Sequence, residues 1–575
     1  MTRIVSPGPI QKQQRTNQRW MPLVFTAMLF SVASQFAFAN PNKLDSFAKS
    51  TIEAPRAGQS KSYIVAINGS LTAAHRKSLK SIRAKVVGHV RLIDTYVVVV
   101  PDKSLHALAA LPFVKRVSSD VPVQKNDVVT LERTFAKEAF EDYGLTGEGV
   151  TVAVIDSGVS KHADLTDPDS GQSRIIGSMN FVPSSNSSDD ANGHGTHVAG
   201  IVAGSGEMSS GPKSFKTYFG MARGAKIVNV RVLDSLGQTK VSTLLSALQW
   251  VVDNRQKYKI RVLNLSLGHA VGESYTTDPL CQAVEKAWKS GIVVVCAAGN
   301  EGRSRKLALG PDSDNDGYGT EYGSIGSPGN DPYVITVGSM RSEDANRQND
   351  TASTFSSRGP SMLDFVLKPD IMAPGNKIIS LRKPLSFLEL TSLTNVVPAK
   401  EYVSGAGLLS ASHYFRLSGT SMAAPVVAGA AALMLQKDPT LSPNTVKARL
   451  MLSADKWFDA NGEADPCTYG SGYLNVVKAL QSNVIATQSA NSPFLVRNSL
   501  GDVMIKMDDS IWGERALWGT NISELRAVWG NRALWGKNTL GGNRALWGKS
   551  VWGNRAIWGK NVIDLGLLDI LLSGD

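Results

Sequence analysis

The sequence predicts an α/β fold in which helices flank a mostly parallel sheet. Three largely apolar, β-branched runs support this prediction, residues 150–155, 262–267 and 292–298, because strands buried on both faces of a sheet form nearly continuous hydrophobic segments. Residues 422–435 are apolar almost all round, so we expect a buried helix there. With 42% apolar residues and 52 glycines, the 575-residue chain can build a large core.

Residues 1–39 have the composition of a secretory signal peptide. Basic residues lie within 3–19, an apolar run extends from Met21 to Phe36, and Ala37–Ala39 fits the A-x-A cleavage pattern, which would leave Asn40 as the new N-terminus. A membrane anchor is the alternative, but the run is short for a span and ends in small residues. We expect a secreted chain, extracellular or periplasmic if the host has two membranes, with no stable membrane span in the mature form.

Residues 61–124 predict a small, separate α+β unit. Strand-like and helix-compatible segments alternate there, and the order strand–helix–strand–strand–helix–strand is typical of a ferredoxin-like fold. The clearest segments are the strands 62–67 and 96–100 and the helices 71–83 and 105–111. The junction with the following domain is expected within residues 121–130.

Three polar side chains stand where a predicted strand or helix meets a glycine-rich bend. Asp156 follows the first buried strand, at the edge where open α/β sheets place their sites, His194 begins a helical segment, and Ser421 precedes the buried helix. Alone, each could be a turn, a loop or a helix start. Together, in the order Asp, His, Ser, they fit a nucleophilic serine with its base and orienting carboxylate. His197 is interpreted as a helix-packing residue.

The buried helix after Ser421 suits this chemistry. Its positive N-terminal end favours a group that meets developing negative charge. Pro425 is expected in its first turn, where a missing N–H costs little.

These motifs resemble those of the subtilisin-like serine proteases, over about residues 130–485 and more weakly back to about residue 60. The resemblance rests on Val154–Gly158, His194–Gly200 and Ser418–Pro425. It implies a subtilisin-like catalytic domain over residues 127–482, a secreted endopeptidase that is made as a self-processing precursor, and polypeptide substrates. We expect a monomer.

The resemblance also implies a role for each site residue. Ser421 would be the nucleophile, His194 the base and then the acid, and Asp156 the residue that orients it. Asn300, which could also be a turn residue, would donate its amide to the oxyanion. The segments Ser266, Leu267, Gly268 and Ala297, Ala298, Gly299 would form the walls of the pocket for the residue before the scissile bond (P1), with Gly326 at its base. No carboxylate occurs in these segments, so we expect large apolar or aromatic P1 residues.

Residues 40–126 resemble the propeptide of this family, which acts as chaperone and inhibitor. An independent adaptor domain is the alternative. The net charge of +12 comes from the N-terminal part of the chain. Residues 1–126 hold 18 basic and 5 acidic residues, whereas the remainder holds 43 basic and 44 acidic residues. The basic excess thus lies in the part that we expect to be removed, which argues against a nucleic-acid partner for the mature chain.

An acidic loop is the candidate metal site. Asp312, Asp314 and Asp316 alternate as in the first half of an EF-hand loop, but Gly323 stands where the bidentate Glu would be expected. Members of the family often carry calcium in surface loops, so we expect structural calcium, with a solvated acidic loop as the alternative. No cofactor is expected for the chemistry.

The three cysteines are an odd number for an exported protein. Cys296 lies in a predicted buried strand and is expected to be an inert apolar residue. A bond between Cys281 and Cys467 is left open.

The end of the chain departs from the family pattern. Residues 483–509 are expected to be a linker, and residues 510–575 a β-rich accessory region, because Trp-Gly recurs there and holds seven of the 11 tryptophans. A self-packed or processed tail is favoured over a ligand-binding one.

Two other functions are considered for the whole chain. A catalytically weak surface-binding protein that uses the Trp-Gly repeats is the alternative outside enzymology, and the presence of all four catalytic side chains argues against it. An α/β-hydrolase esterase would need Gly-x-Ser-x-Gly and the reverse residue order.

Overall fold

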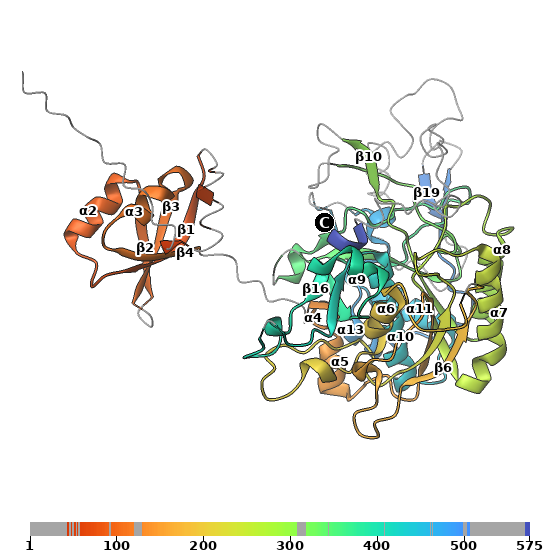
Figure 1. Ribbon diagram of the computed structural model, residues 1–575. Helices are drawn as coiled ribbons and strands as arrows, with labels where there is room; N and C mark the ends of the chain where they lie inside the picture. The colour runs from red at the N-terminus through yellow and green to blue at the C-terminus, as the bar shows by residue number, and fades with distance from the viewer. Residues whose placement is uncertain are drawn as a thin grey trace, which may run out of the picture. The chain divides into compact units, whose positions relative to one another are not determined.

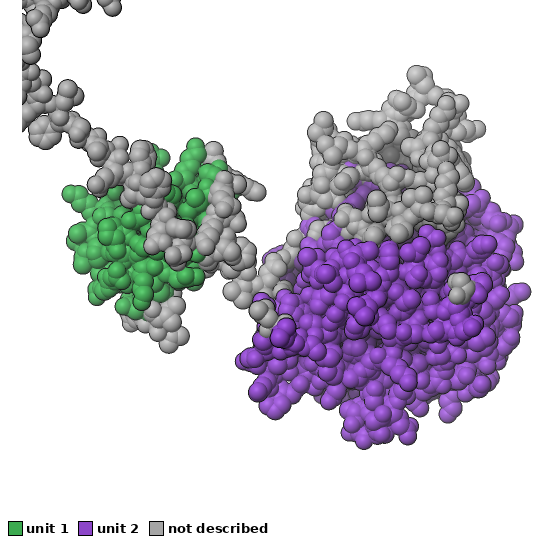
Figure 2. All heavy atoms as spheres, in the orientation of Figure 1, with its two compact units in different colours: residues 1–123 green, residues 124–575 purple. Residues whose placement is uncertain are grey.

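The computed structural model describes residues 60–90, 94–119, 129–307, 318–497, 503–506 and 570–574, apart from isolated positions, and a few residues between 43 and 59. The chain divides into two compact units, residues 1–123 and 124–575 (Figure 2). The predicted signal peptide, the loop with Asp312, Asp314 and Asp316, and the Trp-Gly repeats lie outside the described residues. Among the helices described, none is long and apolar enough to span a bilayer.

The first unit has the β–α–β–β–α–β order expected from the sequence. Its elements are β1 (Ser60–Ile67), α2 (Ala73–Ser81), β2 (Lys85–Val90), β3 (Thr95–Pro101), α3 (Leu105–Ala110) and β4 (Val114–Ser119). The four strands form an antiparallel sheet in the order β2-β3-β1-β4. Tyr63, Val98, Leu105 and Leu108 are fully buried between this sheet and the helices, so the unit has a core of its own.

The second unit is built on an eight-stranded sheet in the order β13-β12-β9-β8-β5-β7-β6, with β14 also paired to β12. All its pairs are parallel except β12 with β13. The strands are β5 (Thr151–Asp156), β6 (Ile175–Asn180), β7 (Lys226–Arg231), β8 (Ile260–Leu265), β9 (Val293–Ala297), β12 (Ile335–Arg341), β13 (Thr351–Ala352) and β14 (Ile371–Pro374). The predicted parallel α/β sheet is thus confirmed, with β5, β8 and β9 as adjacent central strands.

Helices cover the sheet in two groups (Figure 1). The helices α6 (His194–Ala203) and α10 (Thr420–Lys437) contact each other, and α10 contacts β8, β9 and β12. The helices α7 (Val241–Tyr258) and α8 (Pro279–Lys289) also pack together and contact β8 and β9. Residues 422–435 of α10 are buried, as their apolar composition predicts. Pro425 is the exception, because it lies inside α10 and not in its first turn.

Shorter elements surround this core. The helices are α4 (Val129–Thr134), α5 (Ala136–Tyr143), α9 (Phe387–Thr391), α11 (Pro443–Ser453), α12 (Pro466–Tyr469) and α13 (Val476–Gln481). The strands are β10 (Arg303–Leu307), β11 (Tyr318–Thr320), β15 (Ile378–Leu381), β16 (Val396–Val397), β17 (Tyr414–Leu417), β18 (Phe494–Arg497) and β19 (Val503–Lys506).

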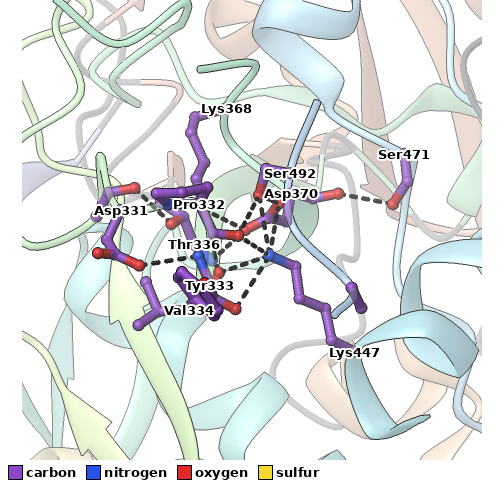
Figure 3. Close-up of polar contacts among 12 residues, drawn as sticks. Asp331, Pro332, Tyr333, Val334, Thr336, Lys368, Asp370, Lys447, Ser471 and Ser492 are labelled. Atoms are coloured by element: carbon purple, nitrogen blue, oxygen red, sulfur yellow. Dashed lines mark hydrogen bonds and ion pairs between the residues drawn. The ribbon is translucent and has the colours of Figure 1, made fainter. Parts of the chain in front are cut away.

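Part of the expected linker, residues 483–509, packs on the rest of the second unit instead. The backbone N–H of Ser492 donates to the Pro332 carbonyl at 2.8 Å, and the Leu495 N–H donates to the Phe365 carbonyl at 2.8 Å. The Ser492 hydroxyl enters a buried cluster with Lys368, Asp370 and Lys447 (Figure 3). The polar sequence concealed this packing, because its serine satisfies buried charges that lie far away in the chain.

The cysteines are all free and buried, so the bond left open between Cys281 and Cys467 is not formed. The Cys281 thiol donates instead to the side-chain oxygen of Asn330 at 3.3 Å. Burial raises the pKa of the Cys281 and Cys296 thiols, which makes them poor nucleophiles.

Candidate active site

Asp156 and His194 form a short, buried pair at the carboxyl end of β5. The Nδ1 atom of His194 lies 2.7 Å from Oδ1 of Asp156, and the same oxygen accepts the backbone N–H of Ser157 at 2.7 Å. Helix α6 can approach β5 so closely because Gly195 has no side chain, since an added Cβ would lie 2.2 Å from the Gly158 carbonyl oxygen. The carboxylate therefore fixes both the orientation and the tautomer of the imidazole.

A second buried carboxylate, Asp190, supports the start of α6. It accepts hydrogen bonds from the Ser157 hydroxyl at 2.8 Å and from the backbone N–H groups of Gly193 at 2.7 Å and Thr196 at 2.8 Å. Helix α6 has no side-chain cap at its N-cap, Gly193. Asp190 takes over this function from outside the helix, and its charge lies near the positive helix end.

The charge state of His194 reflects both carboxylates. Burial lowers its pKa, whereas the charge and hydrogen bond of Asp156 and the charge of Asp190 raise it, and the net shift is upward. His197 shows the opposite behaviour, because burial, with a smaller contribution from His194, lowers its pKa to about 3. Its Nε2 lies 3.1 Å from the Ile378 carbonyl and 3.0 Å from the Phe415 carbonyl, so it bridges two strands as a neutral packing residue.

Ser421 lies in the first turn of α10, and a reciprocal contact with Ser266 holds it. The Ser421 hydroxyl donates to the Ser266 carbonyl at 3.1 Å, and the Ser266 hydroxyl donates to the Ser421 carbonyl at 2.8 Å. The second bond explains how Pro425 is tolerated inside the helix. Proline has no N–H for the carbonyl four residues earlier, which is that of Ser421, and Ser266 supplies the missing donor.

In the described part of the chain, Ser421 and His194 share no hydrogen bond. The Ser421 hydroxyl donates to the Ser266 carbonyl instead. Long or poorly aligned contacts of this kind are common in proteins without bound substrate.

The side chain of Asn300 is oriented by Thr420. Its Oδ1 accepts both the backbone N–H of Thr420 at 2.9 Å and the Thr420 hydroxyl at 3.0 Å. The amide nitrogen is therefore the end that faces away from Thr420, and it lies 3.3 Å from the position of a Cβ built on Gly419. A hydrogen-bond donor thus lies beside Gly419, the N-cap residue of the helix that carries Ser421.

The three segments expected to bind substrate lie side by side. The Gly326 N–H donates to the Ala298 carbonyl at 3.0 Å, and the backbones of His269 and Ser327 exchange two hydrogen bonds at 2.9 and 2.8 Å. These contacts join the ends of β8 and β9 to the loop around Gly326. The predicted residues that they bring together are Ser266, Leu267, Gly268, Ala297, Ala298, Gly299 and Gly326.

Comparison with known proteins decides the family. The sequence model of the subtilase family (Peptidase S8) matches residues 147–472, more than half of the chain. This chain belongs to the subtilase family. It is 37% identical to the serine protease AprX of Bacillus subtilis over 69% of its own length and 81% of that relative. It is 31% identical to subtilisin E of the same species, over 81% of this chain and 100% of that relative. It is 34% identical to subtilisin DY of Bacillus licheniformis, over 59% of this chain and 93% of that relative.

The protein is accordingly a serine endopeptidase of the subtilisin type, and its fold is the α/β fold that the resemblance implied. Sequence reasoning missed Asp190, which contacts the helix that carries His194, and Thr420, which contacts Asn300. A signal for Asp190 existed, since an acidic residue just before a helix that lacks its own cap is favoured by the helix dipole. Thr420 carries no comparable signal.

Proposed function

We propose that Ser421, His194 and Asp156 hydrolyse peptide bonds through an acyl-enzyme intermediate. Ser421 Oγ attacks the carbonyl carbon and its proton passes to His194 Nε2. The C–N bond then breaks, and the leaving amine takes that proton. Water attacks the ester by the reverse sequence, with His194 again acting as base. The observation that supports this most directly is the 2.7 Å contact between His194 and Asp156 at the end of β5.

Asn300 and the N–H of Ser421 are proposed to hold the oxyanion. The side-chain amide of Asn300 is kept in place by Thr420, and the Ser421 N–H is among the first groups of α10, which have no partner inside the helix. Two fixed donors that meet the negative charge as it develops lower the barrier without reorganisation.

Ser421→Ala tests this mechanism, with casein as substrate. We expect no measurable hydrolysis, whereas Ser246→Ala, an exposed serine on α7, should retain full activity as the matched control. A Ser421→Ala protein that digested casein like the wild type would refute the mechanism.

We further propose that the protein is secreted as a precursor and processes itself within residues 121–130, with the first unit then acting as inhibitor. The separate core of that unit supports independent folding. In the test, the Ser421→Ala precursor is expressed alone and its N-terminus determined. An uncleaved precursor is expected, and maturation to the wild-type N-terminus would show that another protease makes the cut.

For specificity, we propose large apolar or aromatic P1 residues. Gly326 leaves room at the proposed pocket base, and the joined segments carry no carboxylate that would select a basic residue. A peptide library should show cleavage after Phe, Tyr or Leu. Dominant cleavage after Arg would overturn the proposal.

A further inference from the structure

The segment 570–574 lies against the strand that leads to the nucleophile. The backbone N–H of Ser418, which follows β17 and precedes Ser421 by three residues, donates to the Leu571 carbonyl at 2.8 Å. The side-chain amide of Asn395 donates to the Leu572 carbonyl. Two backbone carbonyls of this segment are therefore bound by donors that belong to the catalytic unit, from sequence positions more than 150 residues away.

Apolar packing and shape reinforce these bonds. Ile570 is 9% exposed, and Leu571 and Leu572 pack against the main hydrophobic core. Gly574 has a φ of +69°, and a Cβ built on it would lie 2.1 Å from Asn376 Oδ1 and 2.4 Å from Ser418 Oγ. This position admits only glycine, so the segment fits the surface closely.

Chain geometry limits the distance between this segment and the scissile bond. Three residues span at most about 10 Å, so the Ser418 contact lies within that distance of Ser421. The segments proposed for the acyl side of the substrate, Ser266–Gly268 and Ala297–Gly299, make none of the contacts given above for residues 570–574. A substrate extended beyond the scissile bond by two to four residues reaches about 7–14 Å on the other side.

We propose that residues 570–574 occupy the leaving-group side of the active site as an internal ligand, which substrate residues downstream of the scissile bond must displace. This inference rests on the proposed role of Ser421. Because the segment is covalently attached, its effective concentration is high and weak contacts suffice to keep it bound. Short substrates that have no residues after the scissile bond do not contact the segment and need not displace it.

The test compares two substrates on the mature enzyme, whose intact mass is measured first to establish that residues 570–574 are present. One substrate is a peptide p-nitroanilide, which has no downstream residue, and the other is an internally quenched peptide with four downstream residues. The variant ends after Asp569. Two hydrogen bonds are lost, so we expect KM for the longer peptide to fall about fivefold or more, and kcat/KM for the anilide to stay unchanged.

A point variant and an added peptide sharpen the test. Gly574→Ala should behave like the shortened chain, whereas Gly144→Ala, with a φ of +63° and nothing within 4 Å of the added Cβ, controls for backbone strain. The peptide Ile-Leu-Leu-Ser-Gly-Asp should inhibit the shortened enzyme competitively against the longer substrate and not against the anilide.

Two outcomes overturn the proposal. Unchanged KM for the longer peptide in both variants would show that the segment blocks nothing, and equal changes for both substrates would show a purely structural contact. Failure of the mechanism at Ser421 is distinguished from both outcomes, because Ser421→Ala itself would then leave anilide hydrolysis intact.

Discussion

Replacing Asp190 by Asn should show how Asp190 supports the position of His194 and how it affects the pKa of His194. Oδ1 of Asp190 accepts three hydrogen bonds, from the Ser157 hydroxyl and the backbones of Asn192 and Gly193, and an amide oxygen can retain them. Oδ2 accepts the Thr196 N–H at 2.8 Å. In the variant an NH₂ group faces that N–H, so one bond becomes a contact between two donors.

The size of the effect follows from this single lost bond. A hydrogen bond to a charged group and the donor that it leaves unsatisfied together cost about 2–4 kcal/mol of unfolding free energy. Burial raises the pKa of Asp190, which means that its charge is unfavourable in the folded protein. Removing the charge therefore offsets part of the loss in unfolding free energy. Thr196 lies in the first turn of α6, two residues after His194, so a shift of that turn also moves the imidazole. We expect kcat/KM to fall about 10- to 100-fold.

The pH profile carries the decisive information. His194 must be neutral to act as base, so activity rises as pH increases through its pKa. The charge of Asp190 contributes to raising that pKa. Its removal lowers the pKa, and the acidic limb of kcat/KM moves to lower pH, measured with a short chromogenic peptide.

The neighbouring Asp189→Asn is the matched control, because the Asp189 side chain is 52% exposed and pairs with Lys383 at the surface. It should change neither the pH profile nor stability appreciably. An acidic limb that stays in place in Asp190→Asn, or moves to higher pH, would refute the electrostatic part of the reasoning. Unchanged stability would refute the structural part.

Four further predictions concern other parts of the chain. Asn300→Leu should lower kcat by about 10²–10³ with little change in KM, as loss of this donor does in subtilisin; a kcat within twofold of wild type would contradict the oxyanion role. Lys447→Met should cost about 3–5 kcal/mol in urea unfolding, because it leaves Asp370 buried with one lysine fewer. If the acidic loop binds calcium, chelator should lower Tm, and Asp314→Ala should abolish that difference. A chain that ends after residue 506 should fold and cleave short peptides, as measured by circular dichroism and anilide hydrolysis.

The parts of the fold that could be predicted are those in which the residue type alone determines burial. The runs that became β5, β8 and β9 are apolar on both faces, and α10 is apolar all round, so only a covered sheet and a central helix accommodate them. The positions of Asp156, His194 and Ser421 at the ends of such elements followed from the same patterns.

Buried polar partners could not be predicted in this way. Lys447 contacts the carbonyls of Pro332 and Val334 at 2.7 and 2.9 Å and the hydroxyl of Ser492 at 2.9 Å (Figure 3). Lys447 and Ser492 look like ordinary surface residues in the sequence, because a polar side chain is buried only when distant segments supply its partners. The same limit hid Ser492, and with it the packing of residues 483–497 on the core.

Pro425 shows why such partners matter for catalysis. A proline inside a helix leaves one carbonyl without its donor, and here that carbonyl belongs to Ser421. The Ser266 hydroxyl donates to this carbonyl at 2.8 Å, and the side-chain amide of Asn264 donates in turn to the Ser266 hydroxyl at 2.9 Å. The first turn of α10 is thereby fastened to the end of β8 and not only to its own helix. A break in the helical ladder thus links the nucleophile directly to the segment proposed to bind substrate, and no periodicity in the sequence could have indicated that link.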